Sequence, residues 1–284
     1  MSTATWTPRT HRWRRTDASL IVGGALVCAV VLAALVSFVW TPYDPLAMDP
    51  AARLQGPGAQ HWLGTDKFGR DVASSLLVGS RTTLLVGVVA VGVAALVGVP
   101  LGILAAMSSR PLAAILMRGM DILLAFPALL LAIMFSAVYG ASTSMAMLAI
   151  GIASIPSFAR VVRSGALQVM RTEYILAARA AGRGGPAIAL RHVLPNVAGL
   201  VIVQASVSFA IAILAEAALS FLGFGTPPPT PSWGRMLQES QELLQVAPHL
   251  ALAPGLAIAL AVLGFNLFGD GLRDALDPKL RERT

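Results

Sequence analysis

The stretch Thr82–Ser109, TTLLVGVVAVGVAALVGVPLGILAAMSS, decides the fold, because it runs for 28 residues between Arg81 and Arg110 without a formal charge. A helix needs about 20 apolar residues to cross the hydrocarbon core of a bilayer. This stretch is long enough for one crossing and too uniformly apolar for a helix on a water-facing surface. We therefore predict a membrane-spanning helix at 82–107.

The rest of the chain has the same apolar character. Of its 284 residues, 56% are hydrophobic and only 12% are charged, and the mean hydropathy is +0.73. Soluble domains carry about twice that share of charged residues, and so few charges cannot cover this much apolar surface in water. The composition excludes a disordered chain, a fibrous protein and an ordinary cytosolic enzyme.

Further apolar stretches have the length of a membrane span. The 38 uncharged residues between Asp121 and Arg160 are too many for one helix, and the polar stretch at 140–144 divides them into two. We expect kinks at Pro127 in the third span and at Pro100 in the second. The prediction is an all-α polytopic membrane protein with six transmembrane helices, at 18–40, 82–107, 112–138, 144–162, 197–221 and 247–269.

The first of these spans follows a basic leader, as a signal peptide does. Its apolar stretch is longer than the roughly 7–15 residues of a signal peptide, and no small-x-small cleavage site follows it. We therefore predict that it stays in the protein as an uncleaved span.

Lysine and arginine predict the orientation. With the N-terminus in the cytoplasm, 16 of the 21 basic residues lie inside, as the positive-inside rule requires. The net charge of +7 then reflects orientation in the membrane, and we expect no nucleic-acid binding. The predicted division is a cytoplasmic N-terminal segment at 1–17, a first transmembrane helix at 18–40, an extracytoplasmic loop at 41–80, a transmembrane core at 81–270 and a cytoplasmic tail at 271–284.

Two outer loops, at 41–80 and 223–247, are long and rich in proline and glycine. Within the second, Trp233 to Leu244 has the pattern of a short amphipathic helix. We expect Trp62 and Trp233 to lie at the membrane interface. Such loops either dock an external partner or simply connect the spans, and docking is the interpretation we favour.

The inner segment at 160–196 holds six arginines and one acidic residue, Glu173. Val161 to Ala181 predicts a helix, and Ala187 to Val193 predicts a second, with glycines and Pro186 between them. The resulting projection either tethers the protein to lipid headgroups or docks a cytoplasmic protein. A face of small residues, Ala177, Ala178 and Ala181, favours docking.

Motifs of enzymes are missing from the sequence. It has no G-x-x-x-x-G-K-[ST] phosphate loop, no H-E-x-x-H and no G-x-S-x-G. His61, His249, Glu239 and Glu242 could meet outside, but we expect structural roles for them and no metal site. The single cysteine, Cys28, is expected to be a packing residue.

Two acidic residues fall within predicted spans, where ionisable groups are costly and informative. Glu216 either lines a translocation pathway or holds two helices together by a hydrogen bond. Asp121 either lines the pathway or pairs with Arg118 one turn earlier.

The inner segment resembles the EAA loop of bacterial ABC-importer permeases, whose pattern is E-A-A, three residues, G, nine residues and I-x-L-P. Ala177 and Ala178 match the two alanines, Gly182 matches the glycine and Leu194-Pro195 match the end of the motif. Leu176 replaces the glutamate of the motif and His192 replaces its apolar residue. Glu173, one turn earlier, is a candidate substitute for that glutamate.

Three other segments narrow the resemblance to the C-type subunits of dipeptide and oligopeptide permeases. His61–Arg81 is similar to the H-x-L-G-T-D-x-x-G-R-D segment of that group. The other two similar segments are Ser220–Gly234 and Asn266–Asp274. The resemblance covers about residues 40 to 280, and importers of nickel and glutathione share these segments.

The resemblance implies the type I ABC importer permease fold in the bacterial inner membrane, with both termini cytoplasmic. The implied partners are a second, homologous permease subunit, one or two cytoplasmic ABC ATPase subunits, an extracytoplasmic solute-binding protein and the lipid bilayer. The chain would bind no cofactor itself, because the ATPase subunits would use the ATP and Mg²⁺. A channel acting alone and a membrane scaffold are the alternatives from other classes.

The resemblance also implies roles for individual residues. Coupling to the ATPase would use a set of residues in the EAA loop: Glu173, Tyr174, Ala177, Ala178, Ala181, Gly182, His192, Leu194 and Pro195. Glu216 and Asp121 are the candidates for the translocation pathway. Asp66, Arg70, Asp71 and Trp233 are the candidates for docking the binding protein. The implied cargo is a dipeptide or oligopeptide, with glutathione and nickel or another metal chelate as alternatives.

Overall fold

The computed structural model describes residues 13–276, with side chains from Ala18 onward. Within that range the regular structure is helical, apart from an isolated bridge between Thr65 and Asp71. Five long helices make up the bundle: α1 (Trp13–Val39), α2 (Val72–Met107), α5 (Thr143–Val169), α8 (Leu194–Phe221) and α10 (His249–Leu276). The predicted cytoplasmic segments at 1–17 and 271–284 lie largely outside the described residues, which leave out 1–12, 277–284 and the side chains of 13–17.

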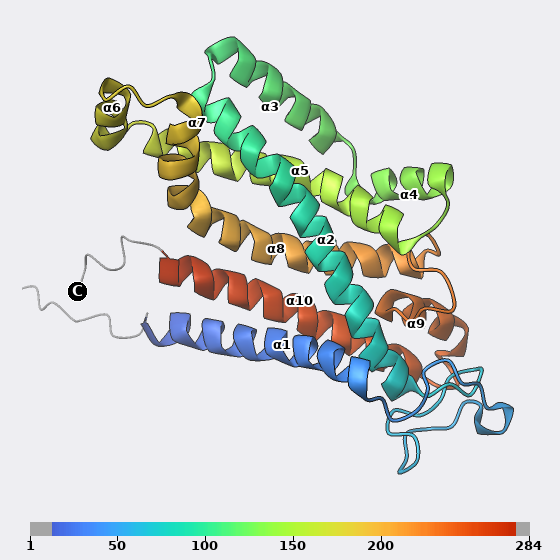
Figure 1. Cartoon of the computed structure of the whole chain (residues 1–284). Coiled ribbons are helices and arrows are strands. Elements are labelled where there is room, and N and C mark those ends of the chain that lie inside the picture. The colour runs from blue at the N-terminus through green and yellow to red at the C-terminus, as the bar shows by residue number, and fades with distance from the viewer. Residues whose placement is uncertain (1–12, 277–284) are drawn as a thin grey trace, which may run out of the picture.

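Helices α1, α10 and α8 run side by side in the bundle, and α2 passes obliquely across them (Figure 1). Helix α1 lies beside α10, and α2 crosses the bundle in contact with α5 and α8. Small residues allow the backbones to approach, because a Cβ at Gly102 of α2 would lie 2.6 Å from the carbonyl oxygen of Ala159 in α5. Helices in membranes commonly pack through such small residues.

Large apolar side chains cover the outside of these helices. Val39, Leu96 and Leu252 are 90%, 79% and 60% exposed. A water-soluble fold rarely leaves so many large apolar side chains uncovered, whereas a bilayer solvates them. All five long helices are long and apolar enough to cross a membrane.

The third predicted span, 112–138, is wrong as a single helix. The chain forms α3 (Arg110–Ala125) and α4 (Ala128–Tyr139), which are bent by 79° at Phe126 and Pro127. Proline disfavours helical backbone in the residue before it, so the kink expected at Pro127 is a complete break. The bent pair makes a sixth span if it crosses as one unit. At Pro100, by contrast, α2 continues as one helix.

Other helix ends also differ from the prediction. Helix α2 begins at Val72 rather than at 82, because the Asp71 carboxylate accepts a hydrogen bond from the backbone N–H of Ser74 and caps the helix. The outer loop predicted at 41–80 therefore ends before residue 72. Helices α5 and α10 continue past the predicted ends at 162 and 269.

The described ends of the chain lie at one end of the bundle (Figure 1). The start of α1 and the end of α10 lie on the same side as the short helix α6 (Glu173–Ala180). The loops before α2 and around α9 (Trp233–Ser240) lie at the opposite end. The start of α1 and the end of α10 therefore lie on the same side of the bundle as the segment at 160–196, as an even number of crossings requires.

Candidate functional site

The EAA-like segment forms a projection at one end of the bundle (Figure 1). Helix α6 is followed by α7 (Gly185–Ile188) and a five-residue π-helix (Ala189–Val193) that leads directly into α8. The helix predicted at 161–181 is interrupted, because α5 ends at Val169 and α6 begins only at Glu173. The second short helix begins at Gly185, earlier than predicted.

The turn after α6 depends on Gly182, as the sequence predicted. Gly182 has a φ of +79°, a conformation that side chains with a Cβ disfavour. The N–H of Arg183 donates to the carbonyl of Ala178 at 3.1 Å, and the N–H of Gly182 donates to that of Arg179 at 2.9 Å. This pair of bonds is the Schellman motif, which ends α6 and reverses the chain.

Apolar anchors hold the projection to the bundle. Ile175 of α6, Ile188 of α7 and Val193 of the π-helix are buried in one cluster with Phe158 and Val162 of α5. Because these anchors face inward, the rest of α6 is presented outward.

The outward side of α6 carries exposed alanines beside larger apolar side chains, and the charged residues Glu173 and Arg179 are exposed there as well. Tyr174 and Leu176 are 45% and 57% exposed, and Glu173, Ala177, Ala181 and Gly182 are also exposed. Ala178 is only half-buried, on the side nearer the anchors. A face of this kind lets another protein approach the helix backbone closely, while Glu173 supplies a carboxylate at the first turn.

The end of the motif lies against the start of α6. The rings of Tyr174 and His192 are 6.0 Å apart between centroids. The Nε2 atom of His192 is buried and has no hydrogen-bond partner in the described part of the chain. Leu194 is half-buried and Pro195 is exposed. His192 therefore occupies the apolar position of the EAA pattern as a packing side chain.

The segment His61–Asp71 forms a compact, hydrogen-bonded turn at the opposite end. Asp71 accepts from Ser74 and lies 2.9 Å from Nδ1 of His61, and the Asp66 carboxylate accepts from the N–H groups of Phe68 and Arg70. Thr65 is fully buried and donates to the Ala52 carbonyl. The spacing of the H-x-L-G-T-D-x-x-G-R-D pattern thus has a structural cause, since its polar side chains make the hydrogen bonds that close this turn and join it to neighbouring segments.

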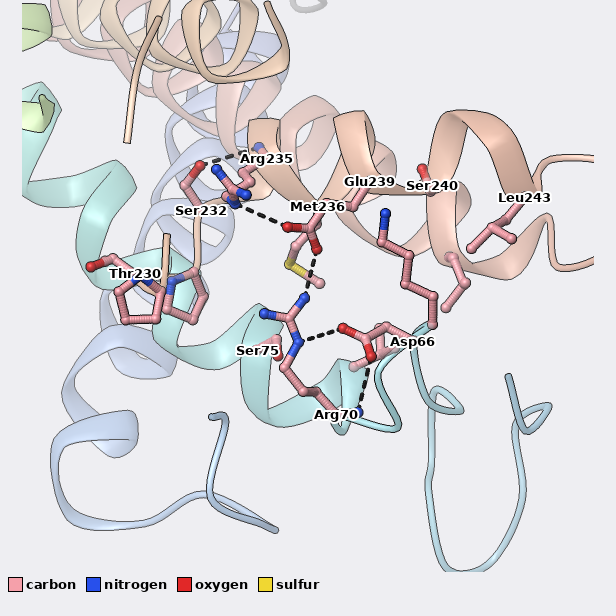
Figure 2. A pocket seen from close by; sticks show the side chains of 15 residues that line it. Asp66, Arg70, Ser75, Thr230, Ser232, Arg235, Met236, Glu239, Ser240 and Leu243 are labelled. Atoms are coloured by element: carbon pink, nitrogen blue, oxygen red, sulfur yellow. Dashed lines mark hydrogen bonds and ion pairs between the residues drawn. The ribbon is translucent and has the colours of Figure 1, made fainter. Parts of the chain in front are cut away.

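A pocket lies between this turn and α9, and we call it the external pocket because the predicted orientation places it outside. Its ionic wall is a chain of charges in which Arg70 donates to Asp66 and to Glu239, both at 2.6 Å, and Arg235 donates to Glu239 at 3.0 Å. Figure 2 shows the Arg70 guanidinium between the two carboxylates. The remaining lining includes Met236, Leu243 and the turn Pro229–Ser232. This network fastens the first outer loop to the second.

Only some of the predicted docking residues are available at this surface. Asp66 and Arg70 line the pocket. Asp71 and Trp233 are 2% and 3% exposed, so they cannot contact a docked protein directly in this structure. The Trp233 indole donates to the Leu76 carbonyl at 2.9 Å, which also places this residue in the protein interior rather than at the lipid interface. Trp62, by contrast, is 59% exposed.

Glu216 is not on an open pathway in this structure. Its side chain is 1% exposed, and its Oε1 accepts from Ser220 at 2.7 Å and from Thr226 at 3.4 Å. The second alternative raised by the sequence, a hydrogen-bonding role, is the one this geometry supports, although its partners lie in its own helix and the following loop.

Asp121 has a different partner from the one predicted. It accepts from Arg160 of α5 at 2.6 Å instead of pairing with Arg118 on its own helix. Both side chains are about half exposed. The bond therefore links α3 to α5 across the inner half of the bundle and gives Asp121 a structural contact.

The histidines and acidic residues do not gather into a metal site within residues 13–276, where no group of three or more potential ligands occurs. His61 pairs with Asp71, and Glu239 joins the ion pairs of the external pocket. Cys28 is exposed on α1, so its expected packing role is wrong for this chain taken alone.

Sequence reasoning missed several residues that build the outer surface. Arg235 was not considered, although its spacing of four from Glu239 on a predicted helix was a usable signal. Thr143 and Thr226 are uncharged and lie far apart in the chain. Nothing in the sequence shows that their hydroxyl groups meet at this end of the bundle.

Comparison with known proteins agrees with this arrangement. Residues 98–282 match the family described as "Binding-protein-dependent transport system inner membrane component". A dipeptide transport system permease protein of Alkalihalophilus pseudofirmus is 44% identical over 261 residues, which cover 92% of this chain and 86% of that protein. A glutathione transport system permease protein of Pectobacterium atrosepticum is 41% identical over 278 residues, covering 97% and 92%.

A putative peptide transport system permease protein of Brucella suis is 44% identical over 263 residues, covering 93% of this chain and 88% of that protein. The predicted resemblance and the type I importer fold are therefore confirmed, with the broken third span as a local departure. The chain belongs to the family of binding-protein-dependent transport system inner membrane components and is a multi-pass membrane protein.

Proposed function

We propose that this chain is the permease subunit of an ATP-driven importer and forms half of a translocation pathway for dipeptides or oligopeptides. It acts with a second permease, one or two cytoplasmic ATPases and an extracytoplasmic solute-binding protein. It sits in the bacterial inner membrane with both termini in the cytoplasm. The chain performs no chemistry itself, and ATP and Mg²⁺ are used by the ATPase subunits.

One observation carries this proposal, the presentation of α6. Helix α6 projects from the bundle with exposed or half-buried alanines at the EAA positions, while Ile175, Ile188 and Val193 anchor its base in the core between α2 and α5. A projection held in this way moves together with the transmembrane helices when a partner grips it. ATP binding in that partner then biases the bundle between inward-open and outward-open states.

The partners are tested by purification of the tagged chain from its native membrane in mild detergent. We expect mass spectrometry to identify a second permease and ATPases with phosphate loops. Recovery of the chain alone or as a homo-oligomer, from membranes in which control complexes stay intact, contradicts the importer and favours a channel or scaffold.

Coupling is tested with Ala177→Asp. Because Ala177 is exposed, the substitution leaves the packing of α6 intact and adds a charge and bulk to the contact face. We expect uptake of a labelled dipeptide to be abolished while the chain still inserts. We expect the same loss of uptake from Ala178→Asp. Because Ala178 is half-buried, however, that variant changes the packing of α6 as well as its contact face.

A matched control separates the contact from a general effect of charge. Ala59 is an exposed alanine in the outer loop. We expect Ala59→Asp to transport like the unmodified protein. Normal uptake by Ala177→Asp, in a complex that still contains the ATPases, removes α6 from the coupling role.

Glutathione is the second candidate cargo, because a glutathione permease matches almost the whole chain. Competition distinguishes the two. A dipeptide cargo is supported if excess unlabelled dipeptide blocks uptake of the labelled dipeptide and excess glutathione does not. The opposite result, with uptake of labelled glutathione, assigns the importer to glutathione.

A further inference from the structure

We propose that Glu216 is a positioning residue that fixes the external pocket to the outer end of α8. Helix α8 then links this pocket, as one rigid element, to the coupling projection, by which we mean α6, α7 and the π-helix (residues 173–193). This inference rests on the proposed function, since it assigns a mechanical route between the two partner surfaces. It gives the only carboxylate buried deep in α8 a role other than contact with cargo.

Helix α8 has the length for such a link. Residues Gly185–Phe221 form a continuous stretch of 37 residues in which α7 and the π-helix lead into α8. At 1.5 Å per residue the stretch is about 55 Å long. Its inner end carries the anchors Ile188 and Val193, and its outer end carries Glu216 and Ser220.

The carboxylate closes a network of hydroxyl groups at the outer end. Ser220 and Thr226 both donate to Glu216 Oε1, and Ser220 Oγ accepts from the backbone N–H of Thr226 at 3.0 Å. The Thr143 hydroxyl at the start of α5 is 3.2 Å from that of Thr226. Since Thr226 belongs to the loop that leads to α9, the network ties this loop to α8 and α5.

The start of α9 is seated on the same part of α8. Ser232, which caps α9, is fully buried and lies close to the Glu216 carboxylate. A Cβ at Gly234 would lie 2.6 Å from Cα of Ala217, so the two backbones are in contact. The same helix carries Arg235 and Glu239 into the external pocket (Figure 2). The external pocket is therefore attached to the outer end of α8 and is expected to move with it.

The bonding pattern separates two roles for the acid. Oε1 accepts both hydrogen bonds, while Oε2 is buried without a hydrogen-bond partner in the described residues. A glutamine can keep its carbonyl oxygen at the Oε1 position and so preserve the anchor. A negative charge that attracts cargo is lost in the same variant.

The experiment compares Glu216→Leu with Glu216→Gln in the purified complex in lipid vesicles. The readouts are ATP hydrolysis with and without the solute-binding protein loaded with dipeptide, and uptake of the labelled dipeptide. We expect Glu216→Leu to keep its ATP hydrolysis without binding protein within twofold of the unmodified complex. In the same variant we expect at least a tenfold fall in two quantities: the stimulation of ATP hydrolysis by the binding protein, and the uptake of labelled dipeptide. Glu216→Gln stays within about twofold in every readout.

Three outcomes overturn the inference. If the binding protein still stimulates ATP hydrolysis normally in Glu216→Leu, the hydrogen bonds of Glu216 do not couple the external pocket to the ATPases. Equal losses of stimulation and uptake in Glu216→Leu and Glu216→Gln show that the negative charge is required, and not only the hydrogen bonds at Oε1. If Glu216→Leu does not assemble, Thr226→Val removes one donor at nearly constant volume, and unchanged stimulation in that variant also counts against the link.

A failure of the proposed function gives a different result. In that case the unmodified complex contains no ATPases, or its ATP hydrolysis does not respond to the binding protein. The inference falls together with the importer. When the binding protein does stimulate ATP hydrolysis in the unmodified complex, the Glu216 variants test the positioning role by itself.

Discussion

The coupling projection and the external pocket lie at opposite ends of the bundle and are held in opposite ways. The projection depends on three buried apolar side chains and on one glycine turn. The external pocket depends on ion pairs and on fully buried hydroxyl groups such as those of Thr65 and Ser232. Apolar contacts are non-directional and tolerate small shifts, whereas hydrogen bonds require fixed geometry.

This difference suits two tasks. In the proposed function, a projection that binds an ATPase has to move with the bundle, and apolar contacts let it adjust its position. A surface that recognises an external protein has to keep its shape. The π-helix at Ala189–Val193 lies within the projection, and such segments are frequent at functional sites.

The largest effect is expected from removing an apolar anchor. Ile175→Ala deletes a fully buried side chain, which costs about 2–5 kcal/mol in protein cores. We expect α6 to detach and trypsin to cleave faster at the arginines of the loop. The matched control is Leu176→Ala, because Leu176 is 57% exposed. Equal protease resistance in both variants contradicts apolar anchoring.

A smaller effect is expected at the outer turn. Asp71→Ala removes an acceptor of hydrogen bonds from both Ser74 groups and leaves His61 without its partner, at a cost of about 1–3 kcal/mol. We expect a lower melting temperature in detergent. Asp44→Ala is the control, because Asp44 is exposed and its carboxylate accepts from the N–H of Leu46, its near neighbour in the chain. Equal melting temperatures of Asp71→Ala and Asp44→Ala would contradict a stabilising role for the hydrogen bonds of Asp71.

The turn after α6 tests backbone conformation alone. Gly182→Ala introduces a Cβ at φ +79° in open space, so the expected cost of about 1 kcal/mol comes from the backbone and not from crowding. We expect a partial loss of dipeptide uptake. Gly184→Ala is the control in the same loop, since Gly184 has a φ of −71°. Full uptake in both variants removes the turn from the mechanism.

The smallest effect is expected from the ion pair between α3 and α5. Both side chains are about half exposed, and exposed pairs contribute roughly 0–1 kcal/mol. Asp121→Asn should change the melting temperature little and leave dipeptide uptake near normal. A severe loss of uptake without a loss of assembly would return Asp121 to the translocation pathway.

The positions of the membrane helices could be predicted because they depend on a local quantity. The transfer of a stretch from water to lipid depends on its own residues, so the apolar runs locate five helices and the bent pair without any knowledge of their neighbours. The Gly182 turn was predictable for the same reason. The family resemblance was carried by short motifs whose geometry is also local, such as the turn at His61–Asp71.

Only the tertiary structure decided what each polar residue contacts. Glu216, Asp121 and Trp233 lie in predictable helices, but their partners, Thr226, Arg160 and Leu76, are distant in the chain or on another element. Burial of a side chain depends on which helices pack around it, and no local pattern contains that information. The sequence therefore determined a polytopic membrane protein of the permease family with an EAA-like segment. Long-range packing assigned Glu216 to the anchoring of the outer loop and left the face of α6 exposed.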